Sequence, residues 1–232
     1  MCGRFVSTTP LSDLAERLLA DDVRTDDDRP NWNVTPRSSV AIVAETKEHA
    51  RVLDRVRWGL VPSWAKDDKI GDKLINARAE TIREKPAYRS AFSKRRCLIP
   101  VDGFYEWKVV PGQRAKQPVY IHRPDGELIV FAGVYENWKD KRDPAAEWVR
   151  SCSIVTTAAN ATIAKVHDRM PVILMPERHD EWLDPDNHDV ELLARLLVPA
   201  PDDYLSYYPI STAVNRPGNN GPELLEPIAV DG

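Results

Sequence analysis

Hydrophobic and polar residues follow two different periods along the chain, and together they predict a mixed α+β protein. Leucines recur at helical spacing after Thr9-Pro10, which predicts a short amphipathic helix there. Alternating runs predict strands over Val40–Val43 and Arg51–Trp58, paired as a hairpin. Apolar runs further along the chain, several separated by turn signals, predict antiparallel strands: Cys97–Val101, Phe104–Lys108, Val119–His122, Leu128–Val134 and Trp148–Thr157.

The segments between and after these strands complete the predicted architecture. Helical patterns are found over Ala158–Lys165, Pro176–Trp182 and Val190–Leu197, whereas the long stretch from Gly59 to Pro86 is irregular. There is no internal repeat and no linker between two cores. We therefore expect residues 1–232 to form a single α+β domain with a curved, antiparallel, β-barrel-like core flanked by helices.

Composition narrows the class of protein. The three cysteines are an odd number without close spacing, which argues against a disulfide framework or a zinc knuckle. The five histidines form no paired metal-ligand pattern, and no glycine-rich phosphate loop occurs. No apolar run is long enough to span a bilayer, and there is no signal peptide. We expect a soluble, cytoplasmic monomer that needs no metal or cofactor.

The net charge of −4 hides an uneven distribution of charge. Thirteen Lys and Arg against six Asp and Glu between Arg51 and Arg96 give this segment +7 and leave −11 elsewhere. Aromatic residues are interleaved with these cations: Trp58, Trp64, Tyr88 and Phe92. Cations for a phosphate backbone and aromatic faces for unstacked bases favour single-stranded nucleic acid as a partner. The alternative is an ordinary solvated basic surface.

Cys2 is the residue with the most specific candidate chemistry. It follows Met1 and precedes Gly3, and small neighbours of this kind allow the initiator methionine to be removed. Removal places an amine and a thiol on one residue, with ordinary pKa values near ~8 and ~8.5. Such a 1,2-aminothiol captures aldehydes, because the amine forms an imine and the sulfur then closes a thiazolidine ring. The alternative is an incidental cysteine at a frayed terminus.

Three further polar residues lie in otherwise apolar surroundings. Glu106 is flanked by aromatic residues, and burial would suit it to proton transfer, although an alternating strand could equally direct it to solvent. His167 follows a predicted helix, where it could transfer protons or simply bond to Asp168. Asn76 lies in the irregular stretch and could bind a polar ligand or only form a turn.

Six sequence blocks occur in order along nearly the whole chain, and together they resemble the SOS response-associated peptidase (SRAP) family of abasic site processing proteins. The blocks are Met1–Phe5, Asn33–Pro36, Trp58-Gly59 with Pro62 and Trp64, Asn76–Thr81, Asp102–Trp107 and His167–Pro171. Thr35 departs from the alanine often found in the family, a change that we expect to be harmless. The acidic remainder of the chain could weaken DNA affinity at ordinary salt.

The resemblance implies single-stranded DNA containing abasic sites as the partner, with the protein associated with the nucleoid when bound. Mature Cys2 would capture the abasic-site aldehyde as a thiazolidine crosslink, with AP lyase activity and self-removal of Met1. Asn76 would hold the terminal cysteine and the sugar, while Glu106 and His167 would transfer protons. Six further residues would contact DNA: Arg4, Asn33, Trp58, Trp64, Arg78 and Arg83.

Two other functions fit parts of the sequence. One is a cysteine peptidase of the N-terminal-nucleophile type, which would use Cys2 and Glu106 but would not need the basic segment. The other is a non-covalent reader of damaged or modified DNA, in which Cys2 has only a structural role.

Overall fold

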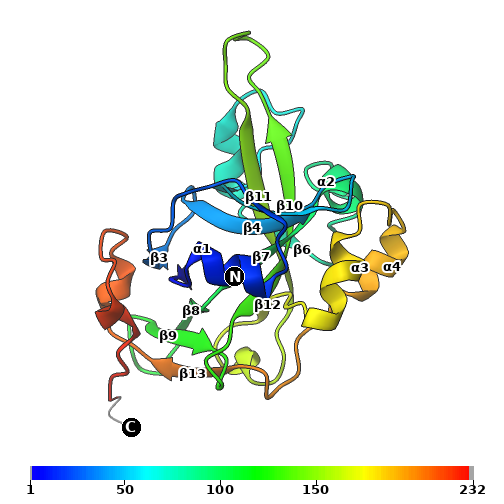
Figure 1. Ribbon diagram of the computed structural model, residues 1–232. Helices are drawn as coiled ribbons and strands as arrows, with labels where there is room; N and C mark the ends of the chain where they lie inside the picture. The colour runs from blue at the N-terminus through cyan, green and yellow to red at the C-terminus, as the bar shows by residue number, and fades with distance from the viewer. Residues whose placement is uncertain (1, 230–232) are drawn as a thin grey trace.

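A closed five-stranded barrel lies at the centre of the computed structural model, which describes residues 2–229 (Figure 1). Its strands, in order around the barrel, are β4 (Ser39–Glu45), β5 (Arg51–Trp58), β11 (Val149–Ala158), β10 (Ile129–Trp138) and β7 (Arg96–Val101). Neighbouring strands pair antiparallel except β5 and β11, which pair in parallel with Cys152 opposite Trp58. Val43 of β4 pairs with Leu98 of β7, and the parallel pair of β5 with β11 closes the barrel.

Shorter strands extend the barrel, and a second sheet packs beside it. The added strands are β2 (Asp22–Val23), parallel to β5, β6 (Asn76–Arg78), parallel to β11, and β12 (Arg169–Pro171), antiparallel to β11. The second sheet is antiparallel and has the order β13 (Ser206–Pro209), β9 (Gln117–His122), β8 (Gly103–Lys108), β1 (Phe5–Ser7) and β3 (Asn31–Val34).

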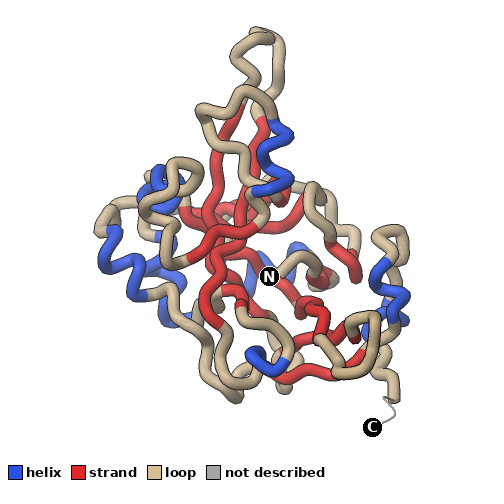
Figure 2. Tube along the Cα trace, turned by 180° about the vertical axis from the view of Figure 1, so that it is seen from behind, coloured by secondary structure: helices blue, strands red, loops and turns tan. Residues whose placement is uncertain are grey.

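Short helices lie around these sheets (Figure 2). The α-helices are α1 (Leu11–Arg17), α2 (Arg89–Lys94), α3 (His179–Leu183) and α4 (Val190–Arg195). The 3₁₀ helices are η1 (Asp68–Lys73), η2 (Ile163–Lys165), η3 (Pro176–Arg178), η4 (Thr212–Asn215) and η5 (Pro222–Leu225). Among the described residues, no helix is long and apolar enough to cross a membrane.

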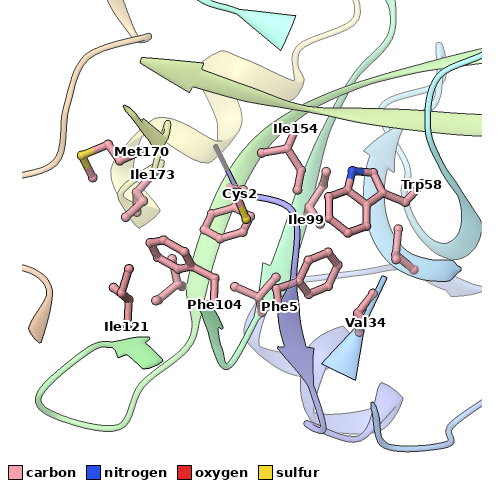
Figure 3. Close-up of a cluster of buried hydrophobic side chains, with 14 of the residues drawn as sticks. Cys2, Phe5, Val34, Trp58, Ile99, Phe104, Ile121, Ile154, Met170 and Ile173 are labelled. Carbon is pink, nitrogen blue, oxygen red and sulfur yellow. The ribbon is translucent and has the colours of Figure 1, made fainter. Parts of the chain in front are cut away.

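Alternation along the barrel strands divides the interior into two main cores. On β7, for example, Ile99 belongs to the core shared with the second sheet, whereas Leu98 packs with the helices on the other face. The first core also contains Cys2, Phe5 and Phe104, so the N-terminal residues lie against the barrel (Figure 3). This arrangement carries the start of the chain to the centre of the molecule.

The α+β fold with a barrel-like core and flanking helices confirms the predicted fold class. Two details differ from the prediction. The helix expected over Ala158–Lys165 is only the short η2, because the Asn160 side chain accepts a hydrogen bond from Ile163 N at 2.9 Å and begins the turn there. The irregular stretch from Gly59 to Pro86 contains η1 and β6. Strand β6 pairs with β11 in parallel, whereas we expected an antiparallel sheet.

Candidate active site

Cys2 is fully buried beside the barrel rather than frayed at the terminus. Its side chain lies among Phe5, Ile99 and Phe104, as Figure 3 shows. Burial, and secondarily the negative charge of Glu106, raise the pKa of the Cys2 thiol well above its usual range. The thiol is therefore protonated at neutral pH. Met1, whose removal the sequence predicts, lies outside the described residues.

Asn76 holds the backbone of Cys2 directly. Its Nδ2 donates a hydrogen bond of 2.8 Å to the Cys2 carbonyl oxygen. The Asn76 Oδ1 atom is buried and accepts no hydrogen bond from any residue that the structure describes. Because a buried amide oxygen without a donor is costly, this atom marks a place where a ligand or a terminal amine can bind.

The backbone at Asn76 is fixed by pairing with β11 and by two side-chain hydrogen bonds. Asn76 lies opposite Ile154 of β11, and Ile154 N donates to Ile75 O at 3.1 Å. The Trp58 indole also donates to Ile75 O, at 2.9 Å, and the Tyr88 hydroxyl donates to Asn76 O at 3.0 Å. These bonds orient the asparagine side chain toward Cys2.

The irregular segment before β6 is closed by two glycines. Gly59 has φ of +117°, a conformation that residues with side chains rarely adopt. A Cβ atom on Gly59 would lie 2.7 Å from the Gly71 carbonyl oxygen, so the two backbones touch. Leu60 N then donates to Leu74 O at 3.1 Å. The segment from Gly59 to Leu74 therefore folds back on itself, which places Asn76 beside the barrel.

Glu106 faces the interior. It lies on β8 opposite Val119, and only 3 % of its surface is exposed. Its charge acts on the Cys2 thiol, so the carboxylate and the sulfur are close enough to interact electrostatically. Of the two orientations that the sequence left open, the structure shows the buried one, which is the orientation that proton transfer requires.

His167 lies just outside the core that contains Cys2. Val166 and Met170, on either side of it in the chain, both belong to that core. Its Nδ1 lies 3.0 Å from Arg169 N and 2.8 Å from Asp168 Oδ1. A neutral ring accepts the backbone N–H at Nδ1 and carries its proton on Nε2, whereas a protonated ring donates from Nδ1 to Asp168. The bond to Asp168, which the sequence offered as the alternative to a proton-transfer role, therefore occurs.

Arg169 was not singled out from the sequence. Its guanidinium forks onto the Glu80 carboxylate, with Nη2 to Oε2 at 2.9 Å, and also donates to Thr156 O at 2.7 Å. The Arg169–Glu80 ion pair joins the block Asn76–Thr81 to the block His167–Pro171. Opposite charges in two of the six sequence blocks were the signal that could have revealed it.

The residues expected to contact DNA divide into two groups. Arg78 is exposed at the end of β6, and Trp64 is 54 % exposed with its indole N–H donating to Pro86 O at 3.2 Å. Arg83 is also exposed, but it pairs with Glu191 at 2.6 Å. These three side chains are accessible to a ligand.

The other three expected DNA contacts are occupied within the protein. Trp58 is fully buried and packs against Phe5 with ring centroids 5.0 Å apart, so its ring cannot line a groove. Asn33 is buried and donates to the carbonyl oxygens of Val214, Arg216 and Asn219. Arg4 donates to Asn33 Oδ1 at 2.7 Å and to Val214 O at 2.8 Å. Its guanidinium is held by these acceptors, and burial lowers its pKa.

The aromatic residues of the basic segment belong mostly to the core. Tyr88 and Phe92 are buried like Trp58, which leaves Trp64 as the exposed one. Their alternation with cations reflects burial of Trp58, Tyr88 and Phe92 in the two cores rather than a series of stacking surfaces. Exposed cations nevertheless remain in this segment: Lys66, Lys69, Lys73, Arg78, Lys85, Arg89 and Lys94. No cluster of acids, cysteines and histidines suited to a metal ion is found within residues 2–229.

A protein with this barrel, and with a buried cysteine in second place held by an asparagine, falls in a known family. The family model described as SOS response associated peptidase (SRAP) matches residues 1–217, and the chain belongs to this family. It is 42 % identical over 227 residues to the abasic site processing protein YoqW of Bacillus subtilis, covering 97 % of this chain and 99 % of the relative. The Escherichia coli abasic site processing protein YedK is 35 % identical over 236 residues, covering 98 % and 100 %.

A solved structure supports the same assignment of the fold. A protein from Bacteroides thetaiotaomicron superposes with a TM-score of 0.84 at 26 % sequence identity, covering 98 % of this chain and 100 % of that chain. The family model spans residues 1–217, a range that includes every block that builds the site.

Proposed function

We propose that this protein processes abasic sites in single-stranded DNA by covalent capture at Cys2 once Met1 has been removed. The observation that carries the proposal is the placement of Cys2, whose carbonyl is bound by Asn76 while its thiol is within electrostatic reach of Glu106. The relatives named abasic site processing proteins support the choice of substrate. The chain 1–232 acts as one domain and as a monomer.

The chemistry follows from an aldehyde meeting a 1,2-aminothiol. The Cys2 amine adds to the sugar C1′ aldehyde, and loss of one water gives an imine. The thiol then adds to the imine carbon, its proton passes to the former amine nitrogen, and a thiazolidine results. Because the thiol is protonated at neutral pH, a base must accept that proton, and Glu106 is the nearby carboxylate.

The other site residues take the remaining tasks. Asn76 fixes the Cys2 backbone through Nδ2, and its Oδ1 accepts a hydrogen bond from the new amine or from the opened sugar. His167 transfers protons in imine formation, in reversal or in strand cleavage by β-elimination. Arg78 and Trp64 contact the phosphate backbone and a base, respectively.

The test uses a single-stranded oligonucleotide with one abasic site and a denaturing gel. The wild-type protein is expected to give a covalent band that Cys2→Ala loses entirely. Cys152→Ala is the matched control, because it removes another fully buried cysteine of the same core and should keep the band. Intact mass of each preparation measures the loss of Met1.

Other gel results would contradict the proposal. A band that persists in Cys2→Ala excludes this cysteine as the nucleophile. Wild-type protein of the correct mass that binds the oligonucleotide without a covalent band is instead a non-covalent reader.

A second candidate activity is peptide-bond cleavage, which the family description favours. The Cys2 thiol would attack the Met1 carbonyl, converting the peptide bond to a thioester, and water would then release methionine and restore the thiol. Expression in a host that lacks methionine aminopeptidase activity, followed by intact mass, tests this. Retention of Met1 there would exclude self-removal.

A further inference from the structure

The hairpin that joins β10 to β11 extends beyond the barrel (Figure 1) and bears a second exposed tryptophan. Trp148, at its base, is 70 % exposed, whereas Trp58, Trp138 and Trp182 are buried. Trp148 and Trp64 line one hollow of about 460 Å³, although they come from different parts of the chain. Exposed large aromatic side chains gathered at one place are typical of a binding surface.

Both walls of this hollow are firmly held. The Trp138 indole at the end of β10 donates to Ala65 O at 2.8 Å, which fixes the segment of Trp64 against the hairpin. Within the hairpin, Lys139 Nζ donates to Pro144 O at 3.0 Å, and Asp143 caps Ala145 N at 2.9 Å. The two indole rings are therefore presented by an organised turn and an anchored loop.

The charges around the hollow suit a polyanion rather than an apolar peptide. Two lysines, Lys139 and Lys141, line it together with two acids, Asp140 and Asp143. Asp140 is paired with the forked guanidinium of Arg142, with bonds of 2.9 and 2.7 Å, and Asp143 accepts from Ala145 N, so both acids have partners within the hairpin whereas the lysines supply the free positive charge. From Lys139 to Arg150 the four cations outnumber the three acids, in a chain whose net charge is −4. Ser63 and Asn137 add polar groups to the lining, and a hydrophobic peptide would leave these groups without partners.

The hollow continues past the hairpin. Trp148 and Asn137 also line a second hollow of about 490 Å³, which Arg24, Asp54 and Arg150 complete. Trp148 is thus a wall between two adjoining hollows. Along the chain, the loop that carries Trp64 continues through η1 into β6, the strand of Asn76 and Arg78.

We propose that this surface, defined by Trp64, Trp148, Lys139 and Lys141, is a second contact region for single-stranded DNA. Unpaired bases of the strand beyond the nucleotide held at Cys2 stack on the two indole rings, and the lysines meet the phosphates. Stacking on indole accepts any base, so the contact lengthens the bound strand without adding sequence preference. The inference rests on the proposed function, because it extends the path of the same strand.

Strand-length dependence of binding tests this surface. Affinities for oligonucleotides of increasing length without an abasic site are measured by fluorescence anisotropy. One base stacked on an aromatic ring contributes enough to change affinity about tenfold. The ratio of affinities for long and short strands is therefore expected to fall about tenfold in Trp148→Ala. Trp148→Tyr keeps an aromatic face, so its ratio of affinities for long and short strands should lie close to that of the wild type.

Val109→Ala is the control variant, since Val109 is 65 % exposed on the separate hairpin after β8 and should leave the ratio unchanged. The inference is overturned if Trp148→Ala leaves the length ratio at the wild-type value, or lowers affinity equally for all lengths. The covalent gel separates this failure from failure of the proposed function, because a Cys2 crosslink with a wild-type length ratio in Trp148→Ala rejects only the second contact region.

Discussion

The Cys2 thiol lies in surroundings that differ from those of most nucleophilic cysteines, which are partly exposed and electropositive. Its pKa is raised first by burial and then by the Glu106 carboxylate. The thiol is therefore protonated at neutral pH. The capture that we propose at Cys2 then depends on transfer of that proton and not on a resting thiolate.

Glu106→Gln tests this arrangement. Removing the negative charge should lower the pKa of the Cys2 thiol, since less repulsion opposes the thiolate, yet burial should still keep it above its ordinary value. Crosslinking should nevertheless slow, because the base is lost. Ultraviolet absorbance of the thiolate against pH, in a Cys97→Ala/Cys152→Ala background, measures the pKa.

Glu136→Gln provides the comparison, because Glu136 is also buried but its carboxylate pairs with Arg95 at 2.7 Å. It should leave the Cys2 titration unchanged. An unchanged or higher thiol pKa in Glu106→Gln would contradict the role assigned to that carboxylate.

Single residues show what the sequence could and could not reveal. Cys2 was identifiable because its chemistry depends on position in the chain, which the sequence states directly. The burial of Glu106 could not be predicted from the sequence, because neighbouring strand positions face opposite sides of a sheet and tertiary pairing sets the register. Trp58 and Asn33 were assigned to DNA because they lie in family blocks, but their side chains bind Ile75 O and the segment 214–219.

Among the elements, α2, α3 and β7 are joined by one buried cation, Arg96. Its guanidinium donates to carbonyl oxygens at the ends of both helices and beyond: Phe92, Ser93, Trp182, Asp184 and Asn187. Burial lowers the pKa of Arg96 to about 10, so it remains charged at neutral pH. The charge thus neutralises the carboxyl ends of two helices.

Arg96→Lys should destabilise the protein although it keeps the charge. An ammonium has three donors and cannot reach five carbonyl oxygens, so at least two would be left buried without a donor. We expect the free energy of unfolding to fall by about 2–4 kcal/mol, measured by urea denaturation. Arg95→Lys should cost less than about 1 kcal/mol, because its partly exposed pair with Glu136 can be kept.

Elements were predictable where one periodicity persisted over several residues. The β4–β5 hairpin and helix α1 occur where the pattern placed them. Strand β6 could not be predicted, because it has three residues and forms only by pairing with β11, far along the chain. The same holds for barrel closure, which depends on a parallel pair between β5 and β11.

For the molecule as a whole, buried ionisable groups predict sensitivity to alkali. All three cysteines are fully buried, and burial raises the pKa of each thiol. Above about pH 8.5 the unfolded chain releases thiol protons that the native protein retains. Stability therefore falls as pH rises, by about 1.4 kcal/mol per pH unit for each thiol.

Urea denaturation between about pH 8.5 and 10, below the ordinary range of tyrosine, measures this slope. Cys97→Ala/Cys152→Ala should reduce the slope by about two thirds, since one of three thiols remains. A slope that stays the same in the double variant would show that other groups dominate the alkaline response.

The clamp formed by Arg4 and Asn33 has a consequence for biosynthesis. Arg4 binds Val214 O, 210 positions further along the chain, and Asn33 binds the same carbonyl and its neighbours. The ribosome therefore releases the start of the chain long before the residues that secure it exist. The N-terminal segment can therefore take up its final position only when synthesis is nearly finished, and the aldehyde capture that we propose for Cys2 would begin after that point.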